Sequence, residues 1–218
     1  MTKNNEPRIT SECVMSSSSK EADERRAVND HDVYFNSQFE AEPVYIGPGQ
    51  VACSVNEDEM LVATVGAGVV VSIYDHELKM GALAYVVLPD VMLDCFPFLD
   101  TADRVVVDKA FEPIETCVGE MKRHGAGKTR IKIRLYGGLI GENDPDDRGL
   151  KNTVFVQEYL FRKGLQVYNA DIGGPFIRRV HFFPSTGRAV RRVLKRQKDF
   201  EDMYDLEAGF NRNIINNS

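Results

Sequence analysis

The chain has 218 residues, enough for one domain of ordinary size with its own hydrophobic core. Its hydrophobic fraction of 43% and charged fraction of 28% are typical of a soluble globular protein, and its net charge of -6 argues against general nucleic-acid binding, which needs a basic surface. The longest uninterrupted apolar run, residues 82–88, is far shorter than a membrane-spanning helix, and the first fifteen residues lack the apolar run of a secretory signal. We therefore expect a cytoplasmic protein.

The cysteines stand apart along the chain, without the C-x-x-C spacing of a zinc ribbon or a redox pair. They are Cys13, Cys53, Cys95 and Cys117. In a reducing compartment we expect free thiols, and the sequence gives no reason to expect a metal or a cofactor.

Residues 1–42 form an N-terminal arm that we expect to be disordered or weakly structured, with at most a short helix over residues 20–28. The arm is polar, includes a run of four serines and has few aromatic or β-branched residues with which to build a core. A regulatory or targeting role is the alternative to a plain tail.

Four strands are predicted next, at about residues 44–54, 60–65, 69–74 and 81–88. Each is rich in β-branched or aromatic residues, and polar or glycine-rich turns separate them. Val69, Val70 and Val71 form a continuous apolar run, which indicates a strand buried on both faces.

The second half of the domain alternates predicted helices and strands. Apolar residues at spacings of three and four predict a helix over about residues 108–123, with Pro113 tolerated only in its first turns. A strand at 131–135, a helix at 153–163, a strand at 165–169 and a hairpin of 178–183 with 187–194 follow. Residues 197–218 are interpreted as a charged C-terminal tail.

Residues 61–89 read LVATVGAGVVVSIYDHELKMGALAYVVLP: a strand, a Thr-x-Gly turn, a second strand ending in aspartate, and a Gly-Ala-x-Ala strand closing on Leu-Pro. Together with a Gly-Gly turn at 137–138 and Asp-x-Gly-Gly at 171–174, this order resembles the CheD family, the chemoreceptor glutamine deamidases of bacterial chemotaxis. The resemblance covers about residues 44–196. It implies an α/β (α+β) layered fold, with mixed sheets packed together and flanking helices, as a single domain over residues 43–196.

The residues that would carry the family's chemistry are missing. The resemblance places the nucleophilic cysteine at Gly68 and its histidine base at Tyr85, and only Thr64, the family's third active-site residue, matches by identity. Amide hydrolysis needs a nucleophile and an acid for the departing ammonia, and an unperturbed phenol titrates near ~10. We therefore expect a vestigial site at Thr64, Gly68 and Tyr85, and little or no deamidase activity.

Binding can survive the loss of chemistry, because it needs the shape of a surface and not a thiol. The resemblance implies two partners, the cytoplasmic domain of a chemoreceptor and a CheC-type phosphatase of the response regulator. The expected partner-binding residues are Thr64, Gly66, Gly68, Tyr85, Gly137, Gly138, Asp171, Gly173 and Gly174. The alternative is an active deamidase with a relocated nucleophile, for which Cys53 and His181 are the candidate pair.

Three further motifs have simpler interpretations. Residues 125–129, GAGKT, resemble the end of a phosphate-binding loop but lack its first glycine and lie between a helix and a strand. The acidic residues of 144–147 lack the spacing of a calcium loop and are interpreted as a solvated loop. The six basic residues of 188–198 form either a solvated edge or a patch that attracts an acidic partner.

Overall fold

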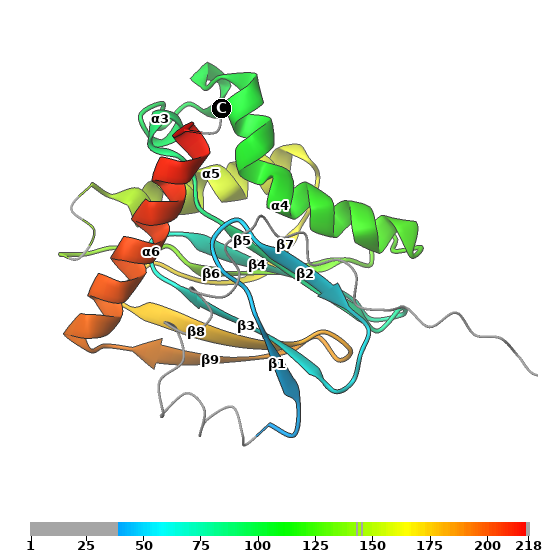
Figure 1. The fold of residues 1–218 in the computed structure, drawn as a ribbon. Coiled ribbons are helices and arrows are strands. Elements are labelled where there is room, and N and C mark those ends of the chain that lie inside the picture. The colour runs from blue at the N-terminus through cyan, green and yellow to red at the C-terminus, as the bar shows by residue number, and fades with distance from the viewer. Residues whose placement is uncertain (1–38, 143, 145, 217–218) are drawn as a thin grey trace, which may run out of the picture.

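The computed structural model describes residues 39–142, 144 and 146–216. In these residues, nine strands form two mixed sheets that pack face to face, and helices cover the outer face of one sheet (Figure 1). The expected α+β class with layered mixed sheets and flanking helices is confirmed. Almost all of the N-terminal arm, including the expected helix at 20–28, lies outside the described residues.

The first sheet has the order β1-β3-β8-β9. Its strands are β1 (Glu42–Tyr45), β3 (Glu59–Val65), β8 (Ile177–Phe183) and β9 (Arg188–Leu194). β1 runs parallel to β3, and the other neighbours are antiparallel. The predicted hairpin is β8 and β9.

The second sheet has the order β2-β5-β4-β6-β7, and only its last pair is parallel. Its strands are β2 (Val51–Ser54), β5 (Met80–Val86), β4 (Val69–Asp75), β6 (Lys132–Gly137) and β7 (Val167–Ile172). β4 is buried on both faces, as its run of valines predicts: Val69 and Val71 face the helices, and Val70 faces the first sheet.

Helices α4 (Arg104–Arg123) and α5 (Arg148–Arg162) lie on the outer face of the second sheet, next to the short turns α3 (Asp90–Leu93) and η1 (Leu99–Thr101) (Figure 1). One hydrophobic core lies between these helices and the second sheet, and another lies between the two sheets. Among the described helices, none combines the length and the apolar character needed to cross a membrane.

Four expectations need correction. Helix α5 begins at Arg148, five residues earlier than expected. The strand expected at 44–54 is two strands, β1 and β2, which a turn sends into different sheets. Helix α4 begins four residues earlier than expected because the Asp103 side chain caps it by accepting bonds from Val105 and Val106. Pro113 therefore lies inside the helix, where it is buried, and not in its first turns.

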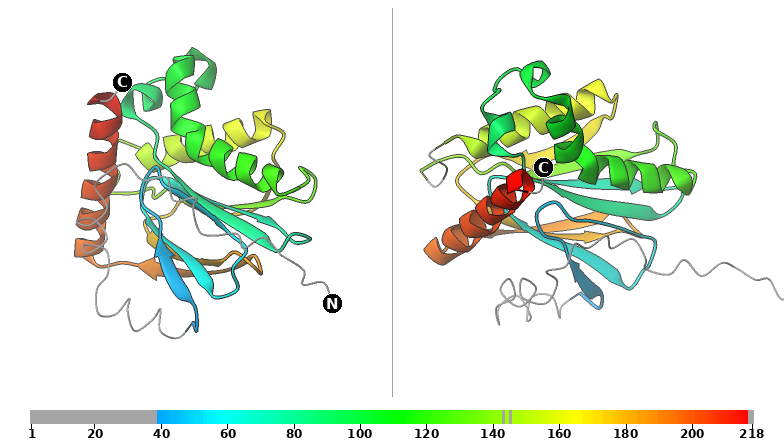
Figure 2. Two further views of the ribbon diagram at one scale, coloured as in Figure 1. Left: turned by 45° about the vertical axis from the view of Figure 1, so that its right-hand side comes forward. Right: turned by 45° about the horizontal axis from the view of Figure 1, so that its top comes forward.

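The fourth correction concerns the C-terminus, where residues 197–216 form the helix α6 (Gln197–Asn216) instead of a tail. Figure 1 and Figure 2 show α6 following β9 and standing beside the ends of both sheets. Phe200, Leu206 and Phe210 pack against the core between the sheets, and Met203 is part of it. The last helix therefore belongs to the folded domain, and it covers the place where the sequence predicts the vestigial site.

Candidate functional site

Three glycine-rich turns from distant parts of the chain meet at the end of the sheets that α6 covers. Gly138 donates its backbone N–H to the Gly68 carbonyl (2.8 Å), and Leu139 donates to the Gly66 carbonyl (2.8 Å). Gly173 in turn donates to the Gly137 carbonyl (3.0 Å). The structure thus brings together the predicted turns 66–68, 137–138 and 173–174.

These turns approach so closely that side chains are excluded from them. A Cβ atom on Gly137, which has φ of 115°, would lie 2.3 Å from the Gly68 carbonyl oxygen. A Cβ on Gly68 itself would lie 2.8 Å from Val87 Cγ2, 2.9 Å from Tyr85 Cε2 and 2.9 Å from the Val86 carbonyl oxygen. The position where the resemblance expects a cysteine therefore has no room for one.

Tyr85 lies on β5, an inner strand of the second sheet between β2 and β4, with its side chain fully buried. Its hydroxyl donates a 2.7 Å hydrogen bond to Oε1 of Glu207 on α6. Burial raises the pKa of Tyr85 well above its ordinary value of 10, and the neighbouring Glu207 raises it further. The hydroxyl therefore stays protonated at neutral pH and acts as a donor, not as a base.

The carboxyl group of Glu207 occupies the turn at 66–68, and sequence reasoning missed it. Oε1 accepts from the backbone N–H groups of Gly66 (3.0 Å) and Gly68 (3.1 Å) as well as from Tyr85, and Oε2 accepts from the N–H of Ala67 (3.0 Å). Glu207 thus accepts hydrogen bonds from four donors, and it is 7% exposed. Burial raises the pKa of Glu207 above its ordinary value of 4.5, while the four hydrogen bonds oppose that rise.

Thr64 belongs to β3 next to this turn, but its side chain points to the other face of the sheet. Its neighbours Ala63 and Val65 face the core between the sheets, so the alternation of the strand turns Thr64 outward. There its hydroxyl accepts a 2.7 Å hydrogen bond from Nε of Arg179. The structure does not join Thr64 with the side chain of Tyr85.

Asp171 lies beside the glycine turns and forms ion pairs with Arg178 (3.2 Å) and Arg191. Arg178 also donates to the carbonyl oxygens of Gly137 (3.4 Å) and Gly173 (2.6 Å). This arginine, held by Asp171, therefore ties two of the glycine turns together.

The candidate pair of the alternative hypothesis lies in different layers. Cys53, on β2, packs against the core beneath the helices. Val180 and Phe182 face the core between the sheets, so His181 points to the opposite side of β8, where its ring contacts Phe39 at 5.5 Å between centroids. The sandwich of two sheets separates the thiol from the imidazole.

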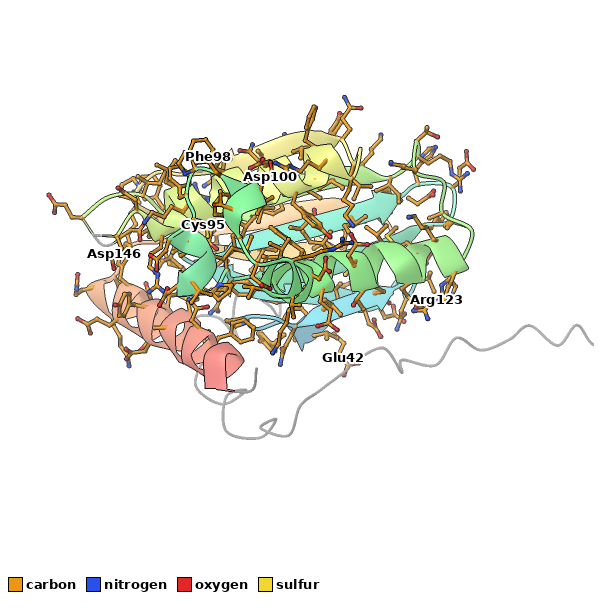
Figure 3. All side chains as sticks on the ribbon, turned by 90° about the horizontal axis from the view of Figure 1, so that it is seen from above. Glu42, Cys95, Phe98, Asp100, Arg123 and Asp146 are labelled. Atoms are coloured by element: carbon orange, nitrogen blue, oxygen red, sulfur yellow. The ribbon has the colours of Figure 1, made fainter. Side chains whose placement is uncertain are left out.

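The other described thiols lie in the helical layer. Cys117 is buried in α4, and Cys95 follows α3, where its Sγ lies 3.5 Å from the Val91 carbonyl oxygen. Figure 3 shows Cys95 near Phe98 and far from Arg123, the last residue of α4. Neither thiol is part of the turn at 66–68.

Comparison with known proteins finds relatives that match most of this chain. A family model described as CheD chemotactic sensory transduction matches residues 109–193. A probable chemoreceptor glutamine deamidase CheD 2 of Burkholderia thailandensis is 29% identical over 183 residues, which covers 83% of this chain and 91% of the relative. A probable chemoreceptor glutamine deamidase CheD of Cupriavidus pinatubonensis is 29% identical over 171 residues, which covers 76% of this chain and 76% of the relative. Another, of Rhodopseudomonas palustris, is 28% identical over 188 residues, which covers 83% of this chain and 83% of the relative.

The chain belongs to the CheD family. The stretch that matches the CheD model begins at residue 109, after both Gly68 and Tyr85, and includes the turns at 137–138 and 171–174. The two positions that depart from the CheD pattern thus lie outside the matched stretch.

A small cleft borders Glu207 in this CheD protein, between α6 and the start of α5. Asp144, Arg148 and Asn152 line it. Asp144 is not part of a solvated loop, as expected from the sequence, but is buried and caps α5 by accepting from the N–H groups of Arg148 (2.9 Å) and Gly149 (2.7 Å). Within the described residues, no group of three or more His, Cys, Asp or Glu side chains is arranged to hold a metal ion.

Chemically, the site presents hydrogen-bond donors and no nucleophile. Three backbone N–H groups and a phenol hydroxyl converge on one carboxyl group, an arrangement suited to holding an anion or another acceptor. Sequence reasoning could have found Glu207 from one signal, the acidic residue at position 207 within the apolar spacing of Phe200, Met203 and Phe210.

Proposed function

We propose that this CheD-family chemotaxis protein has lost glutamine deamidation and acts in the cytoplasm by binding. Its partners are a chemoreceptor cytoplasmic domain, a CheC-type phosphatase, or both. The observation that carries the proposal is the site itself, where close packing at Gly68 leaves no room for a nucleophile while Tyr85 and the 66–68 amides remain arranged as donors.

The magnitude of the chemical loss supports this function. Removal of a nucleophile or its base in a comparable catalytic triad costs on the order of 10⁶ in turnover. Neither the packing around Gly68 nor the raised pKa of Tyr85 offers a substitute for the missing groups. The printed names of the relatives, which describe chemoreceptor glutamine deamidases, support a receptor as the first partner to test.

Calorimetric titration tests the proposal. Purified full-length protein is titrated with cytoplasmic fragments of the chemoreceptors from its own source, and separately with the CheC-type phosphatase. We expect saturable 1:1 binding to at least one of them. Failure to bind any receptor fragment and the phosphatase would contradict the proposed function.

A further inference from the structure

The turn at 66–68, with the Tyr85 hydroxyl, forms a site built only of donors, here called the carboxyl nest. Its backbone amides point toward α6, and its Gly66 and Gly68 carbonyls accept bonds from Leu139 and Gly138 on the other side. These carbonyl bonds do not involve α6. The sheets and the 137–139 turn therefore support the nest through bonds that are independent of the helix that fills it.

The two oxygens of Glu207 use the nest unequally. Oε1 accepts three bonds, and Oε2 accepts one, from the N–H of Ala67. In glutamine an NH₂ group would replace one of these oxygens, and nitrogen of an amide cannot accept. With the carbonyl at the Oε1 place, two donors would face each other at Ala67, which leaves this partly buried N–H without its protein acceptor. A carboxyl group, ionised or protonated, keeps an acceptor at both places.

Helix α6 has the character of a bound ligand as much as of a core element. Met203, Glu207 and Asn211 form its buried stripe, so two of the three most buried positions are polar. A buried carboxyl group is costly unless donors satisfy it, and here all the satisfying donors belong to the nest. Only residues 195 and 196 separate α6 from β9, so the helix can leave without unravelling a strand.

We propose that the carboxyl nest is a binding site for a glutamate side chain on an amphipathic helix, selective for glutamate over glutamine. In this arrangement α6 fills the nest within the chain, and a glutamate-bearing helix of the partner exchanges with it. The inference rests on the proposed function, and it names the state of the receptor that is bound. Because deamidation converts glutamine to glutamate, the protein recognises the product of the reaction that its family performs.

Two helical peptides test the selectivity. Both carry the sequence of residues 197–216 with a fluorescent label, one with Glu and one with Gln at the position of Glu207, and binding is followed by anisotropy at pH 7.5. The receiving protein is the full chain with Glu207→Ala, which removes the carboxyl group from the nest and weakens the docking of α6 relative to a peptide that carries Glu. We expect the Glu peptide to bind at least about 10-fold more tightly than the Gln peptide, because one hydrogen bond is lost and two donors are brought face to face at Ala67.

The wild-type chain and Glu201→Ala are the matched controls, because Glu201 is an exposed glutamate on the same helix. In both, the intact α6 competes at a high effective concentration, so we expect at least about 10-fold weaker binding of the Glu peptide. Equal binding of the two peptides by Glu207→Ala, or tighter binding of the Gln peptide, would overturn the inference. Absence of binding by a folded Glu207→Ala protein would overturn it as well.

If Glu207→Ala fails to fold, Glu207→Gln in the full chain decides the same question by amide hydrogen exchange. We expect the N–H groups of residues 66–68 to exchange at least about 10-fold faster than in wild type, with Glu201→Gln unchanged. Equal exchange in Glu207→Gln and wild type would contradict selectivity for a carboxyl group.

Receptor fragments with either Glu or Gln at their modification sites separate this inference from the proposed function. Binding of both forms with equal affinity leaves the proposed function standing and overturns the inference. Selective peptide binding together with no binding of any receptor fragment or phosphatase supports the nest and contradicts the proposed function.

Discussion

At the scale of a single residue, the close packing around Gly68 determines that this site has no nucleophile. The neighbours of Gly68 belong to the inner strand β5 and the segment after it, so they cannot move without disturbing the core between the sheets. A nucleophile cannot be restored here by one substitution, because the Cβ atom alone is already too close to Tyr85 and to the Val86 carbonyl oxygen.

We expect Gly68→Cys to lower the free energy of unfolding by about 1–3 kcal/mol through overpacking, without producing deamidase activity. Urea unfolding and an ammonia assay measure the two effects. Gly119→Cys is the matched control, because a Cβ at Gly119 meets nothing within 4 Å and should not destabilise the protein. Release of ammonia by Gly68→Cys would show that the site keeps the rest of its chemistry.

Tyr85→Phe removes one of the four donors to Glu207 and leaves the ring in place. A hydrogen bond to a carboxylate in a buried site is worth about 1–3 kcal/mol, and we expect a loss of this size in the free energy of unfolding. Tyr204→Phe, on the same helix but 52% exposed, should change it by less than about 0.5 kcal/mol. A double-mutant cycle with Glu207→Gln should show coupling, and additive losses would contradict the contact.

At the scale of elements, most strands could be predicted from local sequence. β4 is predicted by its run of valines, and β8 and β9 are predicted by a hairpin pattern, because neighbouring residues along the chain are enough to indicate these strands. The split of residues 44–54 and the earlier start of α4 could not be read in this way, since they depend on which sheet a strand joins and on the cap at Asp103.

Helix α6 was missed because its sequence is dense in acidic residues, which is typical of a solvated tail, although Phe200, Met203 and Phe210 follow a helical spacing. One of these residues, Glu207, is buried, and only donors 139 to 141 residues earlier in the chain make that burial tolerable. The sequence could therefore predict which glycine turns come together and could suggest a helix after β9, but it could not show that this helix docks Glu207 into the turn at 66–68.

The pH dependence of α6 docking follows from Glu207. Its pKa is raised in the folded state, so its contribution to stability is fully present below its ordinary value of 4.5 and is lost as pH rises through the raised value. We expect the free energy of unfolding of wild type minus that of Glu207→Gln to fall between pH 4.5 and the raised pKa, and then to level. Asp144 and Arg148, which line the adjoining cleft, are common to both proteins.

Chemical unfolding at several pH values, with both proteins in the same buffers, checks this dependence. The pKa of Tyr85 is raised well above 10, so its hydroxyl remains a donor throughout the range. A difference that grows with increasing pH would contradict the sign, and would indicate that the donors of the nest outweigh the cost of burial.

At the scale of the whole molecule, the two sheets place the binding turns at one end and a basic edge strand beside them. β9 and the residues after it carry Arg188, Arg191, Arg192, Lys195, Arg196 and Lys198. β9 is the edge of its sheet and α6 follows its last residue closely, so Lys195, Arg196 and Lys198 lie beside the start of the helix that fills the nest, whereas Arg188 lies at the other end of the strand. An acidic partner would be attracted to this part of the molecule.

We therefore expect Lys195→Glu combined with Lys198→Glu to slow association with a receptor fragment by roughly 10-fold at low salt, with a smaller effect as salt increases. Surface plasmon resonance at two ionic strengths measures the rate. Arg104→Glu combined with Arg123→Glu, at the two ends of α4, makes the same change of charge and should leave the rate nearly unchanged. Equal slowing by both pairs would mean that only net charge matters.

Mass spectrometry of receptor fragments after incubation with the purified protein tests most directly whether the protein binds its partner without deamidating it. At protein concentrations that saturate binding, the account expects no conversion of glutamine to glutamate above the rate without protein, and the same result for Cys53→Ala. Conversion by the wild-type protein that Cys53→Ala abolishes would contradict the account and establish a relocated nucleophile.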